Sequence, residues 1–185
     1  MGTMLASGSD VVGFLKEQHQ EIKRLFANVK SSRGEEREKA FYALRRMLAV
    51  HETAEEEIVH PAARRVLPDG EAIINARLAE EKKAKGVLAE LESLGVDSLE
   101  FQRKLEGLEK DVVAHAESEE HDEFERLGNA LDQSRLERMQ SAVAFAEKVA
   151  PTRPHPGIES KAANVLAGPF ASMVDRVRDA ITGKA

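Results

Sequence analysis

The hexapeptide HETAEE at residues 51–56 returns at residues 115–120 as HAESEE, so the pattern H-x-x-x-E-E occurs twice in the chain. A histidine and a glutamate four positions apart lie on one face of an α-helix, with their Cβ atoms about 5–6 Å apart. One such pair is a weak signal, because a single polar residue on a core face is usually a hydrogen-bonded one. Two copies on separate helices, each in line with apolar residues, indicate a shared buried site.

Apolar residues around both motifs recur every three or four positions, which is typical of amphipathic helices. No useful length of the chain alternates with period two, so strands are not expected. Short connections favour antiparallel neighbours. The sequence therefore predicts an all-α fold, an antiparallel up-down four-helix bundle with additional C-terminal helices. The expected helices span residues 10–30, 35–66, 71–93, 99–131 and 133–149.

Four of the six prolines follow residue 150 and divide the chain. We expect a flexible N-terminus at 1–9, the bundle at 10–149, a Pro-rich linker at 150–159 and a C-terminal amphipathic helix or tail at 160–185. That last helix could dock on the bundle, form a homodimer with a second copy, or touch a membrane surface, and docking is favoured.

Composition excludes several classes of protein. The 185 residues include no cysteine, which removes disulfides, thiolate nucleophiles and cysteine-based metal sites. No stretch approaches the roughly 18 apolar residues of a membrane span, and no secretory signal is visible, so a cytoplasmic location is expected. The net charge of −6 disfavours binding to nucleic acid.

Histidine or glutamate interrupts the expected apolar stripe on each of the four bundle helices. Burying three carboxylates and three imidazoles together would cost several kcal/mol per ion unless the charges are compensated. Lysine or arginine could compensate, but two divalent cations account for the whole set more simply. Oxygen and nitrogen ligands without thiolate fit iron or manganese, and six ligands exceed a tetrahedral zinc site. The six residues are His19, His51, Glu55, Glu81, His115 and Glu119.

This arrangement resembles the hemerythrin-like family, the hemerythrin HHE cation-binding domain, over about residues 10–131. The segments at 151–157 and 168–180 also look like tails seen on actinobacterial members. The resemblance implies a four-helix bundle holding two iron ions in an oxo- or hydroxo-bridged di-iron centre. It further implies a small ligand, O2, NO or peroxide, in sensing or in oxidative or nitrosative defence. A catalase-like, peroxidase-like or NO-related activity stays open.

A rival hypothesis is a structural or interaction bundle stabilised by zinc or manganese, without redox activity.

The resemblance maps the family's ligands onto five of the six stripe residues. The exception is Glu81, which stands where the family's third helix usually carries histidine. A carboxylate there makes the site more anionic and argues against reversible O2 carriage. Two alternatives remain: Glu81 could pair with Lys85 one turn on, or the third helix could contribute no ligand.

Two further residues complete the predicted metal site. Glu52 directly follows the first motif histidine, and some family members use a glutamate there as a ligand. His60 precedes Pro61, where many members carry tyrosine. On a straight helix His60 lies about 180° from His51, but Pro61 could kink the helix and turn it inward. His121, about 120° from the face of the second motif, is expected to be exposed.

Overall fold

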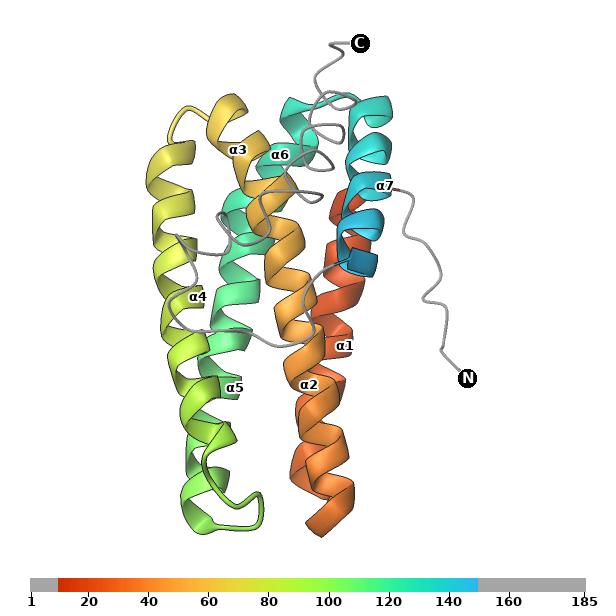
Figure 1. The fold of residues 1–185 in the computed structure, drawn as a ribbon. Coiled ribbons are helices and arrows are strands. Elements are labelled where there is room, and N and C mark those ends of the chain that lie inside the picture. Colours follow the sequence, from red (N-terminus) through yellow and green to blue (C-terminus); the bar gives the residue numbers. More distant parts are fainter. Residues whose placement is uncertain (1–9, 150–185) are drawn as a thin grey trace, which may run out of the picture.

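The computed structural model describes residues 10–149 as four long antiparallel rods with one further helix packed beside them (Figure 1). In chain order the elements are α1 (Val11–Ser31), α2 (Gly34–Ala54), η1 (Glu55–Val59), α3 (His60–Val66), α4 (Gly70–Glu92), α5 (Leu99–Ser118), η2 (Glu119–Phe124), α6 (Glu125–Ala130) and α7 (Gln133–Val149). The second rod is α2, η1 and α3, and the fourth is α5, η2 and α6. Within residues 10–149 there is no strand, so the predicted all-α bundle is confirmed.

The rods begin and end close to the predicted positions. Asp10 caps α1 by accepting a hydrogen bond from the Gly13 backbone N–H at 3.0 Å, and Ser98 caps α5 through the Phe101 N–H at 3.1 Å. Such caps satisfy backbone donors that have no partner inside the helix. The sequence did not predict the two π-helical turns, η1 and η2, which interrupt the second and fourth rods and begin at the glutamate of each H-x-x-x-E.

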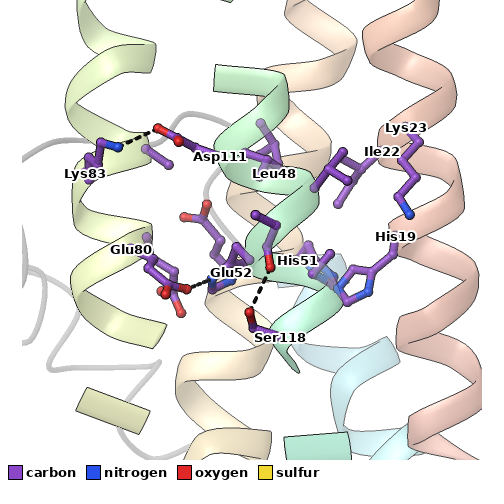
Figure 2. Close-up of a pocket in the computed structure, with 17 residues that line it drawn as sticks. His19, Ile22, Lys23, Leu48, His51, Glu52, Glu80, Lys83, Asp111 and Ser118 are labelled. Carbon is purple, nitrogen blue, oxygen red and sulfur yellow. Dashed lines mark hydrogen bonds and ion pairs between the residues drawn. The ribbon is translucent and has the colours of Figure 1, made fainter. Parts of the chain in front are cut away.

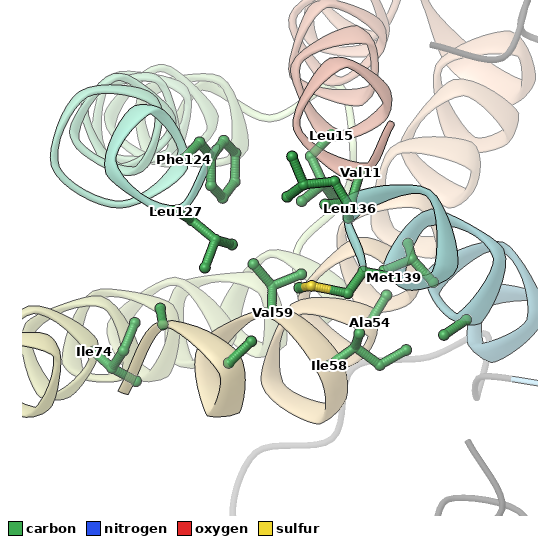
Figure 3. Packing of buried hydrophobic residues seen from close by; sticks show 14 of the residues in the cluster. Val11, Leu15, Ala54, Ile58, Val59, Ile74, Phe124, Leu127, Leu136 and Met139 are labelled. Atoms are coloured by element: carbon green, nitrogen blue, oxygen red, sulfur yellow. The ribbon is translucent and has the colours of Figure 1, made fainter. Parts of the chain in front are cut away.

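The apolar core consists of two clusters, one at each end of the bundle. The first packs the top of the rods against α7 and includes Leu15, Val59, Phe124 and Met139 (Figure 3). The second lies toward the opposite end, among α1, α2, α4 and α5. Between them lies a layer of buried polar side chains. The core is therefore divided by a polar layer near the middle of the rods.

A tight turn connects the second rod to the third. A Cβ atom on Gly70 would lie 2.5 Å from the Ala63 carbonyl oxygen, so only glycine permits this approach of α4 to α3. The turn thereby fixes how α3 and α4 sit beside each other where the second rod meets the third. Among the described helices, none is long and apolar enough to cross a membrane. The segments predicted at 1–9, 150–159 and 160–185, including the proposed dimer helix, lie outside the described residues.

Candidate metal centre

All six residues predicted from the apolar stripes meet in the polar layer. Five of them are at most 3% exposed, and the remaining side chain, that of His115, is 13% exposed. Each of the four rods contributes at least one donor. The six are His19 of α1, His51 of α2, Glu55 of η1, Glu81 of α4, His115 of α5 and Glu119 of η2.

The three imidazoles are held in the same way. Each donates a hydrogen bond from Nδ1 to a side-chain oxygen, while its Nε2 has no hydrogen-bond partner within residues 10–149. The pairs, each 2.8 Å apart, are His19 with Glu120, His51 with Gln18 and His115 with Glu80. A bond at one ring nitrogen fixes the ring and its tautomer, which leaves the lone pair of the other nitrogen for a metal ion.

Glu119 lies between two of these imidazoles. Its Oε2 is 3.4 Å from His19 Nε2, and its Oε1 is 3.2 Å from His115 Nε2. In the first motif, His51 Nε2 lies 3.3 Å from Glu55 Oε2. Two ligands that are each about 2.1 Å from one ion lie about 3.0–3.4 Å from each other. These spacings fit cations seated between the atoms, and each oxygen of Glu119 faces a different imidazole nitrogen.

The donor atoms group into overlapping sets, in each of which all atoms lie within 4.8 Å of one another. Glu119 belongs to both of the sets built from the predicted residues. The first joins His19, His51, Glu55 and Glu119, and the second joins Glu81, His115 and Glu119. The polar layer could therefore hold a cation in each set, and the donors are nitrogen and oxygen atoms alone.

The carboxylates in this layer differ in how far the surrounding protein compensates their charge. Both oxygens of Glu55 and of Glu119 lack a hydrogen-bond partner in the described part of the chain. Burial, with repulsion from Glu119 and Glu81, raises the pKa of Glu55 well above its ordinary value. Burial would raise the pKa of Glu119 too, but the adjacent imidazoles of His115 and His19 lower it. Uncompensated buried charge costs several kcal/mol, and bound cations would offset that cost.

Glu52 lies beside the centre rather than within either set. It is buried, and burial with repulsion from Glu81 raises its pKa to about 8. Lys85 Nζ lies 3.6 Å from Glu52 Oε2 and 3.8 Å from Glu81 Oε2, and it donates a hydrogen bond to Glu56. The alternative pairing of Lys85 with Glu81 is thus a distant contact, because one ammonium group is shared among three carboxylates.

His60 is 2% exposed and faces the polar layer, although a straight helix would place it opposite His51. The cause is the turn η1, in which the His60 backbone N–H donates to the Glu55 carbonyl, five residues back. One extra residue in the turn rotates the helix by about 100° and brings His60 to about 80° from His51. Its Nδ1 is 3.0 Å from Glu123 Oε1, and its Nε2 is 2.9 Å from Glu81 Oε1.

Glu123 is a buried member of this layer that the sequence analysis missed. It is 0% exposed and forms a third set with His60 and Glu119, again within 4.8 Å. Its position four residues after Glu119, one turn further along the same stripe, was the available signal. Gln18 and Glu80, which orient two imidazoles, were also missed, because such partners depend on how neighbouring helices are rotated.

The histidine expected to be exposed is exposed. The His121 side chain is 82% accessible and lies 3.8 Å from Glu125.

A cavity of about 180 Å³ borders the centre (Figure 2). His19, His51 and His115 line its polar part, and side chains such as Ile22, Leu48 and Val112 line its apolar part. Lys83 and Asp111 form an ion pair of 2.6 Å between α4 and α5 on the cavity wall. A molecule of a few atoms can therefore lie next to these three histidine side chains.

The fold and this polar layer define a four-helix bundle with a candidate cation site in its core. The family model described as the hemerythrin HHE cation-binding domain matches residues 10–127, and the chain belongs to this family. The predicted resemblance is thus confirmed. A search of curated proteins finds no match. Among solved structures, a crystal structure of a hemerythrin HHE cation-binding domain-containing protein from Mycobacterium kansasii is similar, with 20% identity and a TM-score of 0.68. The match covers 91% of this chain and 98% of that one, and it supports the fold.

Proposed function

We propose that the polar layer binds two iron ions and that the centre binds or reacts with O2, NO or peroxide, in sensing or in oxidative or nitrosative defence. The observation that carries the proposal is the position of Glu119, whose two oxygens face the unpartnered Nε2 atoms of His19 and His115. A carboxylate between two imidazoles in this way suits a bridge between two cations.

The described side chains divide between the two proposed ions. His19, His51 and Glu55 would hold the first ion, His115 and Glu81 would hold the second, and Glu119 would contribute to both. Glu52 supplies a further carboxylate at the cavity wall, where its Oε2 has no hydrogen-bond partner within residues 10–149.

Donor chemistry favours iron over zinc. The donors are imidazole nitrogen and carboxylate oxygen without thiolate, and they are more numerous than a tetrahedral site requires. A carboxylate-rich ligand set stabilises Fe(III), and iron when bound supplies the redox chemistry. The chain itself orients these side chains, and an apolar cluster packs on each side of the layer.

The size of the cavity limits the ligand. Pockets for drug-sized molecules have volumes of about 300–1,000 Å³, whereas this cavity measures about 180 Å³. A diatomic gas or hydrogen peroxide fits such a space, and a bulky organic substrate does not.

Metal analysis and an optical spectrum of protein purified from iron-replete cells test this proposal. We expect two irons per chain and the visible absorption of bridged Fe(III). Chelation should lower the melting temperature, because a ligand present at 1,000 times its Kd stabilises the native state by about 4 kcal/mol. A colourless, zinc-loaded protein would instead support a metal-stabilised structural bundle. An unchanged melting temperature after chelation would show that the buried donors do not hold a metal.

A further inference from the structure

Three buried residues form a hydrogen-bonded line across the bundle, from η2 through His60 to the predicted ligand Glu81. Glu123 of η2 accepts from His60 Nδ1 at 3.0 Å, and His60 Nε2 lies 2.9 Å from Glu81 Oε1 on α4. The three residues are at most 2% exposed. The line therefore connects three rods and ends on Glu81, which stands where the family's third helix usually carries histidine.

His60 differs from the three other histidines of the polar layer in the use of its ring nitrogens. His19, His51 and His115 each leave Nε2 without a hydrogen-bond partner in the described chain, whereas both nitrogens of His60 contact carboxylate oxygens at hydrogen-bond distance. An imidazole binds a metal through a nitrogen lone pair. His60 would have to give up one of its two hydrogen bonds to bind a cation.

Glu81 is affected directly by this contact. Its Oε1 is engaged by His60, while its Oε2 has no hydrogen-bond partner within residues 10–149. A glutamate carboxyl group rotates broadly about its last torsion, so a bond to one oxygen selects where the other points. Partners of this kind orient ligating carboxylates as they orient ligating histidines.

Resting on the metal centre proposed above, we infer that His60 and Glu123 are positioning residues that hold Glu81 with Oε2 directed to the second ion. Glu123 fixes the ring of His60, and His60 fixes Glu81. The centre then has three histidine ligands, and the buried carboxylate of Glu123 serves as an anchor rather than as a ligand.

Full-length protein loaded with Co(II) tests the inference, because paramagnetic ¹H NMR detects the ring protons of each imidazole bound to the ion. We expect three strongly shifted imidazoles in the wild type, and the same three in His60→Ala. A fourth shifted imidazole that disappears in His60→Ala would make His60 a ligand and overturn the inference.

A matched pair of variants at position 123 adds a test that leaves His60 unchanged. In Glu123→Gln the amide oxygen still accepts from the imidazole, so Co(II) affinity should stay within about threefold of the wild type. Glu123→Ala removes the anchor and should weaken affinity by about 10–100-fold, the usual effect of losing a partner of a metal ligand. An equal loss in both variants would show that the Glu123 carboxylate itself binds the ion.

The proposed function and this inference fail in different ways. A wild-type protein that takes up no Co(II) and shows no shifted imidazole would overturn the metal centre, and the inference with it. A wild type that binds two ions, with affinity unchanged in Glu123→Ala, would leave the centre intact and overturn the positioning role alone. Circular dichroism of each variant shows whether the bundle has folded.

Discussion

The two H-x-x-x-E-E segments have the same sequence pattern and the same backbone course, yet they form different surroundings. In each, the histidine Nε2 lies 3.2–3.3 Å from the glutamate four residues on, and a π-helical turn begins at that glutamate. In the first segment His51 is buried and held by the neutral amide of Gln18. In the second, His115 is partly exposed and held by the carboxylate of Glu80.

The electrostatic consequence is opposite in the two segments. Burial, together with the nearby imidazole of His19, lowers the pKa of His51 well below its ordinary value. Burial would also lower the pKa of His115, but Glu119 and Glu80 outweigh it and raise the value to about 9. One motif therefore forms a closed, neutral half of the centre, and the other forms an open, charged half. A repeated sequence pattern therefore gives the two histidine–glutamate pairs the same spacing but different electrostatic surroundings.

Glu119 and Glu55 occupy matching positions in the two motifs. Replacing each of them in turn should give the largest difference between the motifs. Glu119 belongs to all three donor sets, whereas Glu55 belongs to one. We expect Glu119→Gln to bring metal content close to zero, because an amide oxygen is a poor bridge between two cations. Glu55→Gln should keep about one ion per chain. Elemental analysis measures both, and equal losses would show that Glu119 is not shared.

Removing one motif histidine at a time has the next largest expected effect. His51→Ala and His115→Ala should each lose about one iron per chain, since each removes an unpartnered Nε2 from a different donor set. His121→Ala is the matched control, because that side chain is 82% exposed. Metal analysis with an optical spectrum gives the readout. A loss in His121→Ala as large as in His115→Ala would contradict the assigned face of α5 and η2.

Glu81 belongs to the open half alone, so its replacement should affect one ion. We expect Glu81→Gln to weaken loading of the second ion while the first is retained, because Glu81 is absent from the set of His19, His51 and Glu55. A metal titration with two resolved affinities would show the second lowered and the first unchanged. Retention of both ions with an unaltered spectrum would mean that α4 supplies no ligand.

The sequence predicted the bundle and six central residues, because a period of 3.6 sustained over long helices determines which face is buried. The prediction failed locally at the π-helical turns, where that period breaks. The turn η1 rotates the chain, so the inward position of His60 could not follow from counting along a straight helix. Glu123 was open to prediction as the next turn of its stripe. Gln18 and Glu80 were not, since their contacts reach across to other rods and depend on packing.

Replacing Gln18 and Glu80, which orient His51 and His115, should have the smallest effect and tests the difference between the two motifs most selectively. Gln18→Ala leaves His51 Nδ1 buried without its acceptor, whereas in Glu80→Ala water can replace a side chain that is 43% exposed. Loss of a partner to a metal-binding histidine usually costs about 10–100-fold in metal affinity. We therefore expect Gln18→Ala to fall in that range and Glu80→Ala to remain within about threefold of the wild type.

Chelator competition measures both affinities, and Gln18→Glu is an informative third variant because it keeps an acceptor for His51 while adding a negative charge. If the partner acts by orienting the ring, Gln18→Glu should bind metal far better than Gln18→Ala. Equal affinities in Gln18→Ala and Glu80→Ala would contradict the distinction between a closed and an open half. The two motifs would then be equivalent in binding, and the difference in burial between His51 and His115 would have no bearing on how the ions are held.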